Sequence, residues 1–125
     1  MIKGIGIDTV TISEIGRFLD SETIAKKVFT KRENEIAKLE DDQADYYSRC
    51  FATKEAAFKA LDHLMGGDIF DFTMVETLHH KDGAPYINAS DELKELMKRI
   101  GVDELLVSCT TEGDLCTAIV IAQGK

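Results

Sequence analysis

The segment from Ala44 to Met65 constrains the fold most, because it contains neither glycine nor proline and repeats its large apolar residues at helical spacing. Gly66 and Gly67 follow it directly and end the pattern. We therefore predict a long helix buried at the centre of the molecule. Its apolar stripe consists of Tyr47, Phe51, Phe58, Leu61 and Met65.

The residues before this segment read as one strand and three short helices. The strand runs from Ile2 to Val10, with Ile5 and Ile7 on one face and Gly4, Gly6 and Asp8 on the other. The helices are expected to begin at Thr11 or Ser13, at Ser21, and at a capping box formed by Thr30 and Glu33.

The residues after it read as two hairpins separated by a helix. The first hairpin pairs Phe72 to His79 with a strand around Tyr86 through a turn at Asp82-Gly83. An amphipathic helix follows from Ser90 and is ended by Gly101. The second hairpin joins residues 105–110 and 115–122 through Glu112-Gly113-Asp114. The fold class is therefore α+β, a mostly antiparallel sheet with a long central helix packed on it.

Length and composition limit the possible classes of protein. A chain of 125 residues, 44% of them hydrophobic, is enough for a single domain spanning residues 1–125. No apolar run approaches the ~20 residues that span a bilayer, and the start of the chain lacks the features of a signal peptide, so we expect a cytoplasmic protein with no membrane partner. A formal net charge of −8 argues against a nucleic-acid partner.

Cysteine and histidine offer no metal site in the sequence. Cys50, Cys109 and Cys116 are odd in number and lack metal-like spacing, so we expect reduced, small apolar side chains. His79 and His80 would point to opposite faces of a strand and, like His63, are expected at the surface.

Asp8, Glu55 and Lys59 are the candidate chemical groups. Glu55 and Lys59 are four residues apart and project from one side of the long helix, which by itself is an ordinary helical ion pair. Asp8, at a strand end, could equally cap the following helix. Taken together, two carboxylates and a lysine supply oxygen ligands for Mg²⁺ and a cation for phosphate, a combination that would serve any diphosphate.

The sequence resembles a known family at two signatures, GIGIDTV near the start and CFATKEAAFKAL in the long helix. Together they are similar to the signatures of the holo-acyl-carrier-protein synthases, the small phosphopantetheinyl transferases. The segments FTKRE, DGAPY and LLVSCTTEGDLCTAIVIA extend the resemblance over nearly the whole chain. It implies a 4′-phosphopantetheinyl transferase-like fold.

The resemblance also implies an activity. Enzymes of this family transfer 4′-phosphopantetheine from coenzyme A to a serine of an apo-acyl carrier protein and release 3′,5′-ADP, which supports fatty acid biosynthesis. Asp8 and Glu55 match the positions that bind Mg²⁺, and Lys59 matches the lysine beside the diphosphate. Glu55 or a metal-bound water would accept the proton of the serine, and the sequence leaves that choice open.

Further positions are implied by the same resemblance. Gly66 and Gly67 match a phosphate-binding glycine loop, although a simple helix end is the alternative. Pro85 and Ser108 match positions near the nucleotide, although a turn proline and a strand serine are equally ordinary descriptions. The family forms homotrimers whose clefts lie between subunits.

Three positions depart from the family pattern. Cys50 stands where an arginine is usual, Thr111 where a histidine is frequent, and Glu14 where an arginine faces the carrier. The acidic carrier would be repelled by Glu14 but attracted by a basic cluster. That cluster, with Arg17 nearby, consists of Lys26, Lys27, Lys31 and Arg32, and its alternative interpretation is a solvated surface.

These departures leave three hypotheses about activity. The chain is an active synthase with an altered carrier preference, a weak or specialised paralogue, or a carrier-binding module without catalysis. A generic binding domain, the further alternative, would show no Mg²⁺-dependent chemistry with coenzyme A.

Overall fold

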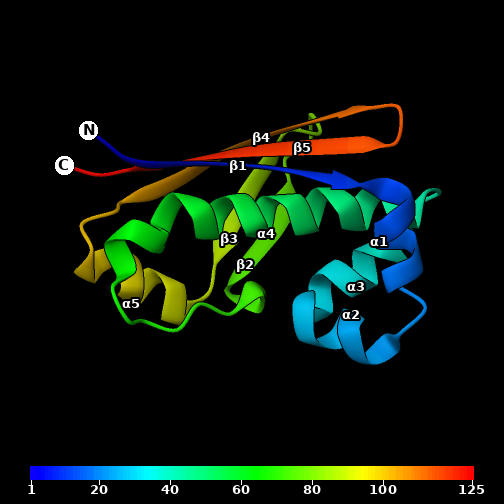
Figure 1. Cartoon of the computed structure of the whole chain (residues 1–125), viewed down its shortest axis with the longest axis horizontal. Coiled ribbons are helices and arrows are strands. Elements are labelled where there is room, and N and C mark those ends of the chain that lie inside the picture. The colour runs from blue at the N-terminus through cyan, green and yellow to red at the C-terminus, as the bar shows by residue number, and fades with distance from the viewer.

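Helix α4 (Gln43–Met65) runs along the inner face of a three-stranded antiparallel sheet (Figure 1). The computed structural model describes residues 1–125. The sheet consists of β1 (Ile2–Thr11), β5 (Leu115–Gln123) and β4 (Glu104–Glu112), in that order, so the first and last strands of the chain are neighbours. The predicted α+β fold with a long helix on an antiparallel sheet is confirmed.

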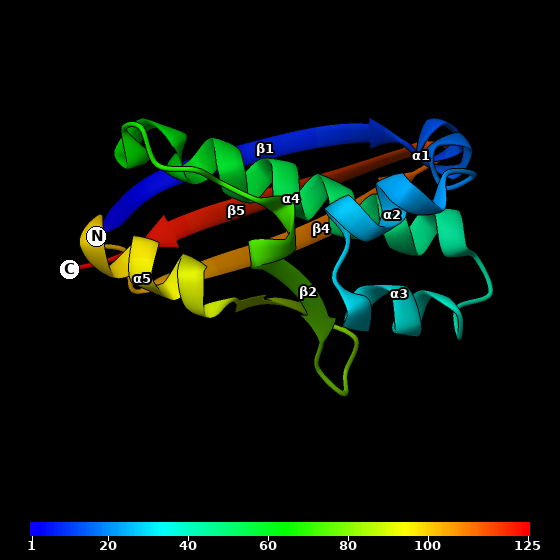
Figure 2. The ribbon, with the colours of Figure 1, turned by 90° about the horizontal axis from the view of Figure 1, so that it is seen from below.

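A second, two-stranded sheet packs beside α4, with β3 next to β4 of the first sheet. It pairs β2 (Val75–His79) with β3 (Pro85–Ala89), and helix α5 (Asp91–Arg99) follows it near the C-terminal end of α4 (Figure 2). Gly83, at a φ of 91°, provides the turn that the Asp82-Gly83 pair predicted. No helix of this chain has both the length and the apolar character that crossing a membrane requires.

The three short helices gather around the N-terminal half of α4 and are called the helical lobe below (Figure 1). They are α1 (Ile12–Phe18), α2 (Glu22–Val28) and α3 (Lys31–Ala37). The predicted caps of α2 and α3 are confirmed, including the Thr30–Glu33 capping box. Thr11 precedes α1 without a side-chain cap, while Ser13 bonds to Asp114 in the distant β4–β5 turn.

One predicted strand was too long. Phe72 to Met74 form a 3₁₀ turn, η1, and β2 begins only at Val75. The alternation of apolar residues indicated a strand, but the side chain of Asp71 accepts a hydrogen bond from the backbone N–H of Thr73 at 2.8 Å and closes a turn.

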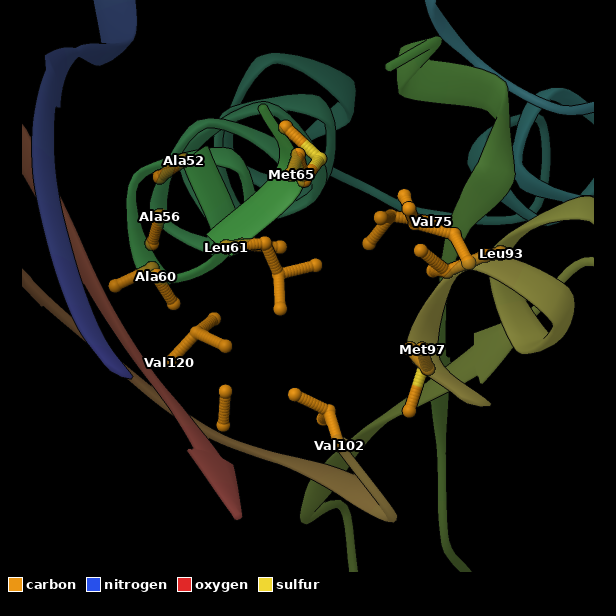
Figure 3. Packing of buried hydrophobic residues seen from close by; sticks show 14 of the residues in the cluster. Ala52, Ala56, Ala60, Leu61, Met65, Val75, Leu93, Met97, Val102 and Val120 are labelled. Carbon is orange, nitrogen blue, oxygen red and sulfur yellow. The ribbon is translucent and has the colours of Figure 1, made fainter. Parts of the chain in front are cut away.

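The face of α4 that meets the sheet is lined by alanine rather than by the predicted aromatic stripe. Ala52, Ala56 and Ala60 are fully buried and point toward β1 and β5 (Figure 3), whereas Phe51 and Phe58 are only half-buried. A Cβ atom on Gly4 or Gly6 of β1 would overlap the carbonyl oxygen of Ala60 or Ala56, respectively. Small residues on both elements therefore bring the two backbones close together.

The core has two parts. The larger lies between α4, the three-stranded sheet, β2 and α5, where Leu61, Val75, Leu93 and Val120 meet (Figure 3). The smaller joins the helical lobe to α4 and includes Cys50, which is fully buried. Burial raises the pKa of the Cys50 thiol and raises that of Cys116 to about 11, so both thiols stay protonated, as expected for free apolar cysteines.

The outer face of the three-stranded sheet is apolar and uncovered in the single chain. Ile5 and Ile7 are 59% and 58% exposed, and Leu106 on β4 is 44% exposed. Ile119 and Ile121 of β5 are half-buried opposite them. A contiguous apolar face of this kind marks an interaction surface.

Candidate active site

Asp8 faces α4 because it shares the inner face of β1 with Gly4 and Gly6. Its partner on β5 is Ala118, which is buried, while Ile5 and Ile7 occupy the outer face. Helix α1 begins four residues later and is not capped by Asp8. The capping alternative is therefore wrong for Asp8.

Lys59 binds Asp8 across the gap between helix and strand. Its Nζ donates to Asp8 Oδ1 at 2.9 Å and to the Ile7 carbonyl oxygen at 3.3 Å. Glu55 forms no ion pair with Lys59, although the two residues are one helical turn apart. The ordinary helical pair is thus not what the structure contains, and Lys59 binds β1 instead.

The three side chains form one electrostatic unit. Burial raises the pKa of the half-buried Glu55 carboxyl, and the charge of nearby Asp8 raises it further. The hydrogen bond to Asp8 raises the pKa of Lys59. Two carboxylates that repel each other around a single ammonium leave a net negative site that favours an additional cation.

The donor set fits Mg²⁺. Two carboxylates give the hard oxygen ligands that this ion prefers, and Mg²⁺ usually takes only one or two of them from a protein. No group of three or more histidine, cysteine, aspartate or glutamate side chains in the chain could hold a metal ion. An ion between Asp8 and Glu55 would therefore draw its other ligands from water and substrate.

The other cofactor-binding candidates lie away from these three side chains within one chain. Gly66, at a φ of 65°, ends α4, and neither Gly66 nor Gly67 has a neighbour that an added Cβ would touch. Pro85 begins β3 opposite His79. Ser108 is exposed on the outer face of β4, on the opposite side of the sheet from Asp8.

The carrier-binding candidates are exposed on the helical lobe. Glu14 and Arg17 lie on α1, and Lys26 and Lys27 form the last turn of α2 without an ion-pair partner. Arg32 on α3 is 3.8 Å from Glu76. The single chain is compatible both with a docking surface and with a solvated one.

The histidines are exposed, as predicted. The ring of His80 stacks on Tyr86 with centroids 4.4 Å apart, and His63 Nε2 lies 3.0 Å from the Lys3 carbonyl oxygen. His79 lies at the rim of the largest cavity, about 640 Å³, between the α3–α4 loop and the β2–β3 hairpin. Asp8, Glu55 and Lys59 do not line this cavity, whose eleven lining residues include four carboxylates.

Sequence reasoning missed Lys54, which precedes Glu55 on α4 but points into the protein. Its ammonium pairs with Glu33 at 2.7 Å, and both side chains are fully buried. The only available signal was the capping box, which marked Glu33 as a structural residue without showing its second partner. Neither residue contacts Asp8 or Lys59.

Comparison with known proteins places this geometry in a family. A model of the 4′-phosphopantetheinyl transferase superfamily matches residues 4–120. The holo-[acyl-carrier-protein] synthase of Myxococcus xanthus is 33% identical over 99% of this chain and 97% of its own length.

Solved structures agree. The holo-[acyl-carrier-protein] synthase of Neisseria meningitidis superimposes with a TM-score of 0.88 at 26% identity, covering 98% of this chain and 99% of that one. The synthase of Bacillus anthracis, described in complex with CoA (3′,5′-ADP), has a TM-score of 0.78 at 25% identity and covers 100% and 99% of the two chains. Because similarity in sequence and in structure extends over essentially the full length, the chain belongs to the holo-[acyl-carrier-protein] synthases of the 4′-phosphopantetheinyl transferase superfamily.

Proposed function

We propose that this enzyme transfers 4′-phosphopantetheine from coenzyme A to a serine of an apo-acyl carrier protein, giving the holo-carrier and 3′,5′-ADP in a Mg²⁺-dependent reaction. The observation that carries the proposal is the meeting of Asp8, Glu55 and Lys59 in a member of this family. The whole chain would act as a single transferase domain in the cytoplasm, serving fatty acid biosynthesis.

Asp8 and Glu55 would hold Mg²⁺, with Asp8 fixed on β1 and Glu55 on α4. The ion supplies charge neutralisation and orientation of the diphosphate of coenzyme A. Supporting this role, the pKa of Glu55 is raised by burial and by Asp8, a cost that a bound cation removes.

Lys59 would stabilise the departing diphosphate. Its side chain is half exposed. It donates one hydrogen bond to Asp8 and a longer one to the backbone carbonyl of Ile7. Released from Asp8, the Lys59 ammonium would donate to phosphate oxygens of the diphosphate. It can then stabilise the charge that develops on 3′,5′-ADP as the bond to phosphorus breaks.

The attacking serine belongs to the carrier and needs a base. Glu55, whose pKa is raised above its usual value by burial and by Asp8, would accept the serine proton, and a metal-bound water is the alternative that remains open. Gly66 and Gly67 would offer backbone N–H groups to phosphate, and Pro85 and Ser108 would lie near the nucleotide.

A homotrimer would reconcile the separated positions. The apolar outer face formed by Ile5, Ile7 and Leu106 needs a cover, and a second copy placed there would bring another chain's Ser108 into a shared cleft. The acidic carrier would dock on the helical lobe through Arg17, Lys26 and Lys27 and past Glu14.

The experiment is to incubate the protein with coenzyme A, Mg²⁺ and several apo-carriers and to look for phosphopantetheine on the carrier serine by mass spectrometry. Addition that disappears with EDTA and returns with Mg²⁺ supports the proposal. If no carrier is modified while one still binds, the second candidate, a non-catalytic carrier-binding paralogue, replaces it. The departures at Glu14, Cys50 and Thr111 are the observation that favours that candidate.

A further inference from the structure

Lys54 and Glu33 form a fully buried ion pair that the reaction described above does not use. Lys54 Nζ lies 2.7 Å from Glu33 Oε1, and both side chains are 0% exposed. Charged side chains are almost never buried this completely unless they are paired. Lys54 directly precedes Glu55 in sequence but projects from a different side of α4.

Every polar atom of the pair has a partner. Lys54 Nζ also donates to the carbonyl oxygens of Phe72, at 3.0 Å, and Val75, so its three protons face three acceptors. Glu33 accepts from the backbone N–H of Thr30 and of Thr77, each at 2.9 Å. All three ammonium protons are used and each carboxylate oxygen accepts at least one hydrogen bond, so the pair holds segments together.

The segments joined by the pair belong to two parts of the molecule. Glu33 and Thr30 begin α3 in the helical lobe, whereas Phe72, Val75 and Thr77 belong to η1 and β2 beside the main core. A second bond runs in parallel, because Thr30 Oγ1 donates to Glu76 Oε2 at 2.6 Å. Lys54 thus ties the start of α3 to both α4 and β2.

Stability alone is a poor explanation of such a pair. Desolvation of two charges offsets most of their attraction, and buried pairs can often be replaced by apolar side chains without loss of stability. What the pair provides is geometry, since its five hydrogen bonds are satisfied together in only one orientation of the lobe.

The metal site is positioned by a different contact. Asp8 and Glu55 are brought together where Gly4 and Gly6 of β1 pack on Ala56 and Ala60 of α4. Loosening the lobe would therefore leave the metal and coenzyme A in place while it moves the surface that receives the carrier.

We propose that Lys54 and Glu33 are positioning residues that hold the helical lobe in the orientation in which it binds the acyl carrier protein. The inference rests on the proposed function, because it assumes that the carrier docks on this lobe. Its signature is a defect in the use of carrier without a defect in binding coenzyme A.

The test uses the double variant Lys54→Met with Glu33→Gln, which removes both charges at nearly constant volume and keeps an amide oxygen for Thr30 or Thr77. Carrier KM should rise about tenfold, with kcat at saturating carrier and the calorimetric Kd for coenzyme A both within about twofold of the wild-type values. Leu96→Ala, in the main core, is the matched control: it lowers Tm but leaves carrier KM unchanged.

A milder variant covers the case in which the double variant does not fold. Thr30→Val removes the bond to Glu76 and the cap of α3 without leaving a buried charge, and it should raise carrier KM by a smaller factor. Unchanged carrier KM, or loss of coenzyme A affinity in step with carrier use, would overturn the positioning role. Failure of the wild-type protein to modify any carrier overturns the proposed function instead, and the inference with it.

Discussion

Lys59 Nζ donates to Asp8 Oδ1 at 2.9 Å across the α4–β1 contact, and it does not pair with Glu55, which lies one turn earlier on its own helix. The lysine therefore occupies one oxygen of a carboxylate that we propose as a metal ligand. Binding of a cation to Asp8 would therefore compete with the hydrogen bond from Lys59, because both use the same carboxylate.

Removing either carboxylate should abolish transfer. Asp8→Ala and Glu55→Ala each leave a single carboxylate for Mg²⁺, so kcat/KM should fall by more than about a hundredfold. Both residues lie outside the buried core, and circular dichroism should show an intact fold. Mass-spectrometric assay of the carrier measures the transfer; full activity in either variant would eliminate the metal site.

Glu55 should make the metal-free protein lose stability as pH rises. Burial, followed by the charge of Asp8, raises its pKa above the usual 4.5, so folding favours the protonated form. The resulting stabilisation is complete below pH 4.5 and is lost as pH rises through the raised pKa. Relative to Glu55→Gln, the wild-type Tm should drop between pH 4.5 and 7.5, and Mg²⁺ should restore it only in the wild type. Parallel Tm profiles with pH would contradict this.

A single methyl group on Gly6 should disrupt the site from within. The Cβ of Gly6→Ala would overlap the Ala56 carbonyl oxygen and force β1 away from α4, so Asp8 separates from Glu55. We expect a loss of about 1–3 kcal/mol of stability by chemical denaturation and a weaker response to Mg²⁺. Gly16→Ala is the control, since its Cβ makes only an ordinary 3.5 Å contact with Ala44 and alanine favours the helix. Equal effects of the two substitutions would argue against the close-contact explanation.

The protein should be a trimer held by the outer face of its sheet. Light scattering should give three times the 13.9 kDa of one chain. Ile7→Lys, which places a charge on this face, should lower the mass, whereas Ile69→Lys, at an 88% exposed position in the loop after α4, should not. Because Asp8 and Lys59 come from the same chain, mixing Asp8 and Lys59 variants should not restore activity. A monomeric wild type at working concentration would refute the trimer.

Glu14 should reveal the charge of the partner. If the native carrier is an ordinary acidic protein attracted by Lys26 and Lys27, Glu14→Arg should speed modification by several-fold at low salt, and the gain should shrink as salt screens it. If the partner places a basic residue against Glu14, the same substitution should slow the native reaction and improve that with typical acidic carriers. Rates that are unchanged with every carrier at low and high salt would remove this surface of α1 from the interface.

Most of the fold was predictable because its signals are local. Each signal determines the structure of the residues around it. These signals are the absence of glycine within α4, the caps of α2 and α3, and the turn glycines Gly83 and Gly113. The η1 turn was missed because its cap depends on one side chain, Asp71, and alternation of Phe72 and Met74 imitates a strand. The order β1-β5-β4 depends on pairings between opposite ends of the chain, which no local pattern contains.

The site was predictable in its residues but not in its contacts. Sequence spacing could not show that Lys59 forms its ion pair with Asp8, 51 positions away, rather than with Glu55. Lys54 was missed for the same reason, since its acceptors Phe72 and Val75 are 18 and 21 positions away. Gly66, Pro85 and Ser108 remain predictions, because one chain does not bring them to Asp8.

Strand β1 pairs with another strand on one side only, with β5, while the carbonyl oxygens of Lys3 and Ile7 are bonded to the α4 side chains of His63 and Lys59. Its side chains include just two charges, at Lys3 and Asp8, and no proline, so little else keeps its unpaired edge from pairing with other chains. A closed ring of subunits limits such growth, whereas an open arrangement would extend into a polymer. Variants that cannot form the closed trimer should therefore precipitate at temperatures below their unfolding temperature. Loss of solubility would then reveal a defect in assembly before loss of activity does.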